Sequence, residues 1–192
     1  MAYEISTDIR VLKTQKALLE AIEELIKTKQ LSCISITELC NAAKINRNTF
    51  YYHYNNINDL IEENKKILEA ELNEVLDVNN PKSKNTINEI CRILKRHPRF
   101  LSILISPNCD INFFEEVFGI ASEKARIQVD RNKEITSPRD VYASYYCNAG
   151  CNAVLSTWIR SGMKESPDEV AEIISLSSRR GPITILFPGE KY

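Results

Sequence analysis

Apolar residues recur every three to four positions along most of this chain. In residues 9–28 the recurring positions are Leu18, Ala21, Ile22 and Leu25, a spacing that predicts an amphipathic helix. No alternating strand pattern of useful length occurs before the last dozen residues or so, and the chain contains only 5 glycines. We therefore expect an all-α protein.

Capping residues and prolines mark where the expected helices begin. Ser35 precedes Glu38 by three residues, and Asn56 precedes Asp59 by three, which is the spacing of a capping box. Two Ser-Pro pairs begin later helices in a similar way. About nine segments result: 9–28, one after Ser35, one from Arg47, 57–76, 87–97, 99–106, 111–132, 138–161, and one from Ser166 to before Gly181.

Residues 35–60 hold the most informative pattern, two short helices on either side of a tight turn at Lys44-Ile45-Asn46. Phe50 and Tyr54 are four residues apart on the second helix, so we expect both to face inward. The rest of that helix is crowded with polar and aromatic side chains, which suits a helix lying in the major groove of DNA. The residues that we expect to contact DNA are Arg47, Asn48, Thr49, Tyr51, Tyr52 and His53.

The run from Thr49 to Tyr54, Thr-Phe-Tyr-Tyr-His-Tyr, is followed by Asn56 and Leu60. It resembles the Tyr-x-His-Phe and Ser/Asp-Lys-x-x-Leu pattern of the TetR family of one-component transcriptional regulators. The family's turn usually has Gly where this chain has Lys44, and its fourth helix usually starts with Lys where this chain has Ile57. Ile57 can offer a phosphate only its backbone N–H.

The resemblance carries further implications for DNA contacts and for assembly. By analogy with the family, Thr37 reaches the groove and Ser35 adds a bond to a phosphate, although a purely structural role is as well supported for each. In TetR-like proteins the final two long helices pair with their symmetry mates, which implies a homodimer. Residues 140–175 are also similar to a subgroup related to dihydroxyacetone kinase regulators, a likeness that carries no ligand with it.

The length of 192 residues fits one small and one larger domain. We place a three-helix helix-turn-helix DNA-binding domain at residues 1–58 and a helical ligand-binding and dimerisation domain at 59–192. The long helix that begins near residue 57 joins the two domains, and a polar linker follows it at residues 77–85.

The expected helix over residues 138–161 mixes bulky aromatic residues with small ones, so we expect it to be buried on more than one side. Most of its aromatic residues, including Tyr145 and Trp158, should lie in the core, and a minority of the chain's aromatic residues should line a ligand cavity. The candidates for that cavity are Phe100, Phe113, Tyr142, Tyr146 and Cys147.

Charge and motif content exclude several classes of protein. A net charge of −1 and a pI near 6.2 argue against a polycation, so any DNA binding must come from a local surface. No segment approaches the roughly 18 apolar residues of a membrane span, and no signal-peptide pattern occurs, which predicts a cytoplasmic protein. Phosphate-loop, metalloprotease and nucleophile motifs are absent from the sequence, so we expect neither an enzyme nor a cofactor.

The six cysteines include no C-x-x-C pair and fall within apolar helical patterns, which predicts reduced thiols in a core. Cys147 and Cys151, four residues apart, are the pair best placed for a redox or metal response. The chain has only two histidines, and His53 is already assigned to DNA, so a structural zinc site is poorly supported.

Together these features predict a dimeric regulator that binds a palindromic double-stranded DNA operator, responds to a small-molecule effector and acts as a repressor. Two other classes stay open. The chain could be a helical adaptor that uses its helix-turn-helix to bind protein, or a small-molecule binding protein without sequence-specific DNA binding.

Overall fold

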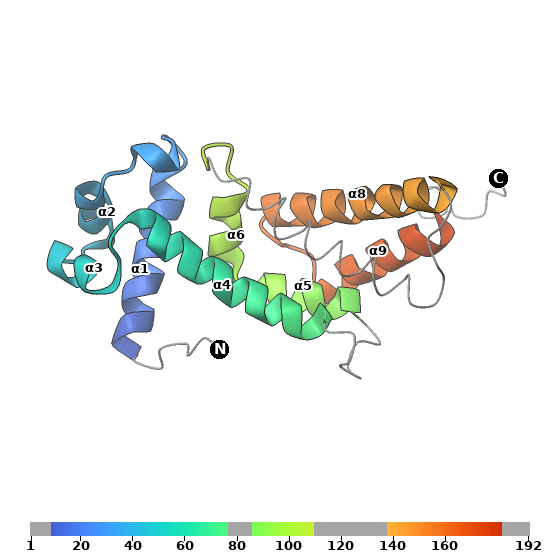
Figure 1. Cartoon of the computed structure of the whole chain (residues 1–192), viewed down its shortest axis with the longest axis horizontal. Helices are drawn as coiled ribbons and strands as arrows, with labels where there is room; N and C mark the ends of the chain where they lie inside the picture. The colour runs from blue at the N-terminus through green and yellow to red at the C-terminus, as the bar shows by residue number, and fades with distance from the viewer. Residues whose placement is uncertain (1–8, 77–85, 110–137, 182–192) are drawn as a thin grey trace. The chain divides into compact units, whose positions relative to one another are not determined.

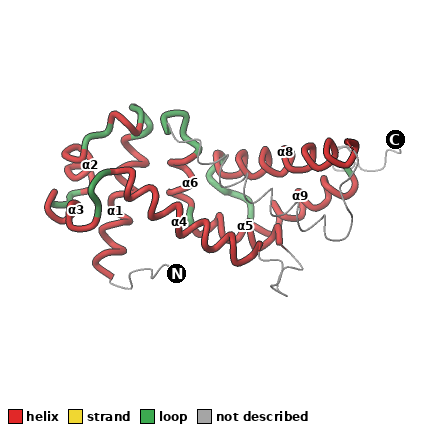
Figure 2. The backbone as a smooth tube through the Cα atoms, in the orientation of Figure 1, coloured by secondary structure: helices red, strands yellow, loops and turns green. Residues whose placement is uncertain are grey.

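The computed structural model describes residues 9–76, 86–109 and 138–181. Within these ranges the regular structure is entirely helical, with eight α-helices, one short 3-10 helix and no strand (Figures 1 and 2). The all-α prediction is therefore confirmed, while the helix expected over residues 111–132 lies outside the described residues. The helices are α1 (Ile9–Leu25), η1 (Leu31–Cys33), α2 (Ile36–Ala43), α3 (Arg47–His53), α4 (Ile57–Leu76), α5 (Thr86–Arg96), α6 (Pro98–Leu104), α8 (Pro138–Arg160) and α9 (Pro167–Arg180).

The chain divides into two compact units. The first contains Met1–Glu71 and Arg99–Phe114, and the second contains Leu72–Pro98 and Glu115–Tyr192. Helix α4 begins in the first unit and ends in the second, and α6 belongs almost wholly to the first. The two compact units are defined by contacts within the chain and not by DNA binding. The predicted boundary between the DNA-binding and regulatory domains, at residues 58 and 59, therefore stays a prediction.

In the first unit, α1 packs on α2, and α2 packs on α3. Leu18, Ala21 and Ile22 of α1 are buried, as the apolar spacing predicts. Helix α6 is held to α1 by polar contacts, because Arg99 pairs with Glu20 at 2.7 Å and the Ser102 hydroxyl donates to Glu23 at 2.6 Å. These contacts place a segment from the middle of the chain against the helix that supports the helix-turn-helix.

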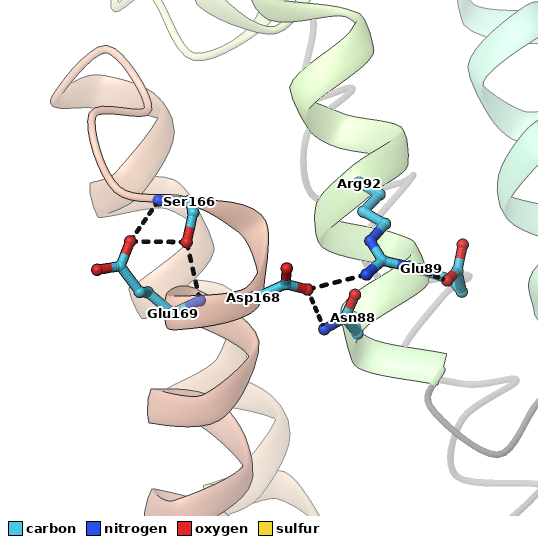
Figure 3. A network of polar contacts seen from close by, with 6 residues as sticks. All are labelled: Asn88, Glu89, Arg92, Ser166, Asp168 and Glu169. Atoms are coloured by element: carbon cyan, nitrogen blue, oxygen red, sulfur yellow. Dashed lines mark hydrogen bonds and ion pairs between the residues drawn. The ribbon is translucent and has the colours of Figure 1, made fainter.

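In the second unit, α9 packs on both α5 and α8. Asp168 in the first turn of α9 accepts hydrogen bonds from Asn88 (2.6 Å) and Arg92 (3.0 Å) of α5, and Arg92 also pairs with Glu89 (Figure 3). The Asn88 amide and, to a smaller extent, the Arg92 guanidinium lower the pKa of Asp168. This network joins two helices that lie far apart in the sequence.

Helix α9 begins with a complete capping box (Figure 3). The Ser166 hydroxyl accepts a hydrogen bond from the Glu169 backbone N–H, and the Glu169 carboxylate accepts one from the Ser166 backbone N–H at 2.8 Å. The Ser166 hydroxyl and backbone N–H together lower the pKa of Glu169. The start of the last helix, predicted from the Ser-Pro pair and the glutamate after it, is confirmed.

Helix α8 departs from the sequence-based expectation. Trp158 is buried as expected, and its indole N–H donates to the Glu165 carbonyl across the turn that leads to α9. However, Tyr142, Tyr145 and Tyr146 are 74%, 69% and 68% exposed. The prediction that Tyr145 lies in the core of its own chain is therefore wrong, because the described part of the chain leaves that side of α8 uncovered.

Candidate nucleic-acid interface

Helix α2 begins at a side-chain cap and is followed by an ion pair. The Ser35 hydroxyl accepts a hydrogen bond from the Glu38 backbone N–H at 3.2 Å. The Glu38 carboxylate pairs with Lys29 at 2.7 Å, and this ammonium is the main cause of the lowered pKa of Glu38. Because the Ser35 oxygen acts as the acceptor in the cap, its O–H is still able to donate to a phosphate. Ser35 and Thr37 are both exposed.

The turn between α2 and α3 is built on Lys44. This residue has φ 56° and ψ 40°, the left-handed conformation that favours glycine, and its backbone N–H bonds back to the end of α2. The turn predicted at Lys44-Ile45-Asn46 is therefore confirmed. This chain has Lys44 where the TetR family usually has glycine, yet it keeps the tight turn. The cost is local backbone strain at Lys44.

We expect Lys44→Gly to stabilise the protein by about 0.5–1 kcal/mol, because glycine relieves the left-handed strain at a modest cost in chain entropy. Urea unfolding followed by circular dichroism measures the change. The matched control is Lys66→Gly in the middle of α4, where glycine should destabilise by about 1 kcal/mol. Equal destabilisation by both substitutions would contradict the strain at Lys44.

Helix α3 has seven residues and is anchored on one side only. Asn46 caps it by accepting the Asn48 backbone N–H at 2.8 Å. Phe50 is completely buried, and Tyr54, directly after the helix, is 6% exposed. Their rings lie 5.7 Å apart between centroids, so the predicted inward pair is confirmed.

The opposite side of α3 presents the residues singled out in the sequence. Arg47, Asn48, Thr49, Tyr51 and Tyr52 are exposed, and His53 is half-buried. The Arg47 guanidinium lies 5.9 Å from the centre of the Tyr51 ring, and the His53 ring stands perpendicular to that of Tyr52 at 4.9 Å. At 84% exposure, Tyr52 projects furthest into solvent of the three tyrosines in this part of the chain.

The loop from α3 into α4 is ordered by amide and carboxylate groups. The Asn56 side chain accepts the Asp59 backbone N–H at 3.0 Å, which confirms the predicted cap of α4. The Asp59 carboxylate accepts both the backbone and side-chain N–H groups of Asn55, and this lowers the pKa of Asp59. Ile57, the second departure from the TetR pattern, buries its side chain at the start of α4.

The contacts of one carboxylate at this site cannot be predicted from the sequence. Glu63 of α4 accepts a hydrogen bond from the Tyr54 hydroxyl at 2.6 Å and another from the Gln15 amide at 3.1 Å. Gln15 lies 48 residues away, so periodicity and capping rules do not reach it. The same holds for the pairing of Lys29 with Glu38, which are nine residues apart.

The candidate ligand residues are distributed over both units. Phe100 is buried in α6 of the first unit, Tyr142, Tyr146 and Cys147 belong to α8 of the second, and Phe113 lies outside the described residues. Cys147 is half-buried. In the part of the chain that is described, no group of three His, Cys, Asp or Glu residues is placed to hold a metal ion.

The cysteines are free thiols, and burial disfavours ionisation of Cys91 and Cys151 in the second unit. Burial raises the pKa of Cys91 to about 12 and also raises that of Cys151, whose sulfur lies 4.0 Å from the Ser178 hydroxyl. Because the thiolate is the reactive form, neither sulfur is activated in this structure.

A capped helix, a tight turn and a short second helix with an exposed polar and aromatic face define a helix-turn-helix protein of the DNA-binding class. Residues 81–179, just over half of the chain, match the family model TetR_C_8, described as "Transcriptional regulator C-terminal region". The chain belongs to the TetR family of transcriptional regulators, as its resemblance predicts, and this is a family of regulators rather than enzymes.

A curated protein is similar to this chain in sequence. The uncharacterised HTH-type transcriptional regulator YxbF of Bacillus subtilis is 24% identical over 163 residues, which are 80% of this chain and 41% of YxbF. The chain thus spans about two fifths of the length of that relative.

Two solved structures share the fold. The dihydroxyacetone kinase operon activator DhaS superposes with a TM-score of 0.54 and 21% identity, over 86% of this chain and 93% of DhaS. NalD of Pseudomonas aeruginosa, described as the secondary repressor of the MexAB-OprM multidrug efflux pump, gives a TM-score of 0.56 and 20% identity, over 88% and 97% of the two chains. The predicted likeness to dihydroxyacetone kinase regulators is confirmed at the level of fold.

Among the described helices, none is both long and apolar enough to cross a membrane.

Proposed function

We propose that this chain is a cytoplasmic, dimeric repressor that binds a palindromic DNA operator through α3 and responds to a small-molecule effector. The observation that carries the proposal is the exposed side of α3, where a guanidinium, an amide, hydroxyls and aromatic rings are presented from a helix anchored by Phe50. Residues 1–58 act as the DNA-binding domain and 59–192 as the regulatory domain. The contacts to DNA come from Ser35, Thr37, Arg47, Asn48, Thr49, Tyr51, Tyr52 and His53.

The uncovered side of α8 supports a homodimer through α8 and α9. The exposed tyrosines are followed on the same helix by the exposed small residues Ala149, Gly150 and Ala153, and a Cβ built on Gly150 meets no atom within 4 Å. A second copy covers this surface, since aromatic and small residues together allow close helix packing. Two-fold symmetry then holds two copies of α3 about 34–36 Å apart, the spacing of successive major grooves.

Helix α4 supports a ligand response, because it starts directly after α3 and reaches the second compact unit. A ligand that prefers one conformer of the regulatory domain changes the spacing of the two recognition helices and thereby releases the operator. Coupling of about 1–3 kcal/mol changes operator affinity roughly 5- to 150-fold. Phe100, Phe113, Tyr142, Tyr146 and Cys147 are the residues proposed to line the effector site.

Selection from random DNA duplexes tests the proposed function. Purified protein should enrich a palindrome, and the enriched duplex should reduce transcription in vitro when placed over a promoter. Enrichment of no sequence at low salt would favour the adaptor or the small-molecule binding protein instead. Increased transcription from a promoter with an upstream operator would make the protein an activator, as DhaS is described to be.

We expect Arg47→Ala and Thr49→Ala each to weaken operator binding by about 1–3 kcal/mol if the side chain contacts a base edge. Loss of a phosphate contact by Arg47 should instead lower the slope of log affinity against log salt by about one. Fluorescence anisotropy over a series of salt concentrations separates the two roles. Lys66→Ala on the exposed side of α4 controls for a general loss of positive charge. Unchanged affinity in both α3 variants would remove this helix from the interface.

A further inference from the structure

The recognition helix buries only a small part of its own surface. Its seven residues have Phe50 as their only buried side chain, and Tyr54 follows as the residue after the helix. The apolar contacts of Phe50 and Tyr54 fix the distance of the helix from the core but do not by themselves fix its rotation, because hydrophobic contacts are not directional. A roll of roughly 10° would move a side-chain tip by about 1–2 Å, enough to spoil a hydrogen bond to a base.

A directional contact is available from one oxygen atom of Glu63. The same carboxylate oxygen, Oε2, accepts the Tyr54 hydroxyl at 2.6 Å and the Gln15 amide at 3.1 Å. Glu63 comes from α4, Tyr54 directly follows α3 and Gln15 comes from α1, and all three lie within the first compact unit. Charge-assisted hydrogen bonds of this kind are short and depend strongly on angle.

The hydroxyl of Tyr54 is also the feature by which this chain departs from the Tyr-x-His-Phe pattern, because phenylalanine cannot make the contact. The ring of Tyr54 already packs on Phe50, with 5.7 Å between the ring centroids. A phenylalanine ring at this position would pack on Phe50 equally well. What the Tyr54 hydroxyl adds is a hydrogen bond that depends on the orientation of the ring.

We propose that Glu63 is a positioning residue for operator recognition, which fixes the rotation of α3 by binding the Tyr54 hydroxyl and the Gln15 amide together. This inference rests on the proposed function of α3 in DNA binding. In this proposal Glu63 makes no contact with DNA. The residue acts through Tyr54 on the angle at which the exposed side chains of α3 meet the base edges.

The test compares specific with non-specific binding. Positioning governs contacts to bases, whereas binding to a scrambled duplex depends mainly on charge. Tyr54→Phe removes only the hydroxyl and should weaken binding to the selected operator about 3- to 10-fold while leaving binding to a scrambled duplex within twofold. A purely structural role would lower the melting temperature and leave the ratio of the two affinities unchanged, and that result would overturn the inference.

Substitutions of Glu63 supply the rescue and the charge control. Glu63→Gln keeps an amide oxygen that can accept both hydrogen bonds, so it should retain the wild-type ratio, as should Glu62→Gln on the neighbouring exposed position. Glu63→Leu removes the acceptor and should lower the ratio as Tyr54→Phe does. The double variant of Tyr54→Phe with Glu63→Leu should lose no more than either alone, because both remove one contact. Independent, additive losses would mean that the two residues act separately and would overturn the proposal.

Wild-type behaviour distinguishes failure of this inference from failure of the proposed function. If the wild-type protein binds operator and scrambled duplex equally, the proposed function itself fails. If the wild type discriminates between them and Tyr54→Phe discriminates equally well, only the role of Glu63 is overturned.

Discussion

Ala153→Arg is expected to separate the dimer and to weaken operator binding about 100- to 10,000-fold, because a monomer loses the second half-site contact. Ala153 is exposed on the side of α8 that the described chain leaves uncovered. An arginine therefore fits the isolated chain, but in the proposed interface it would bury one unpaired charge from each copy. Each protomer should remain folded.

Light scattering for mass and anisotropy for operator affinity measure the two effects. Ala70→Arg is a matched control, since it introduces the same side chain at an exposed alanine of α4, a helix outside the proposed interface. The control should remain dimeric and bind the operator. A dimer that persists in Ala153→Arg would place the interface elsewhere on the chain.

Phe50→Ala is expected to lower the free energy of unfolding by about 3–5 kcal/mol, the usual cost of removing a buried aromatic side chain. Phe50 is completely buried and is the apolar anchor of α3. Its ring also contacts those of Tyr51 and Tyr54, so the cavity would open directly beneath the recognition helix. Operator binding should be lost together with the fold of the helix-turn-helix.

Urea unfolding followed by circular dichroism tests this value through the shift in midpoint. Tyr52→Ala, two residues further along the same helix, removes another aromatic ring from a side chain that is 84% exposed. It should change stability by no more than about 0.5 kcal/mol while weakening operator binding. If Phe50→Ala lowered the free energy of unfolding no more than Tyr52→Ala does, the burial of Phe50 would contribute little to holding α3.

Local patterns were sufficient for most helix boundaries and for the location of the candidate interface. Ser35 and Glu38, like Ser166 and Glu169, are three residues apart, so the contact that begins each helix is made within one turn of chain. Phe50 and Tyr54 are four apart, so the helical period predicts that they face the same way, and both are buried although Tyr54 lies just after α3. The exposed residues of α3 follow as the remainder of the same helix.

Two features could be learned only from the tertiary structure: which distant residues are in contact, and which helix faces are covered. Gln15 meets Glu63, and Asn88 meets Asp168 80 residues away, because separate helices pack together, and neither periodicity nor capping specifies such a pairing. The period of α8 predicts that Tyr142 and Tyr146 share a face with each other, but not whether anything covers that face. The sequence thus determined the helices, the inward anchor of α3 and the family pattern, since these depend on residues within a few turns. The Glu63 contact and the uncovered side of α8 depend on how whole helices pack, which no local pattern encodes.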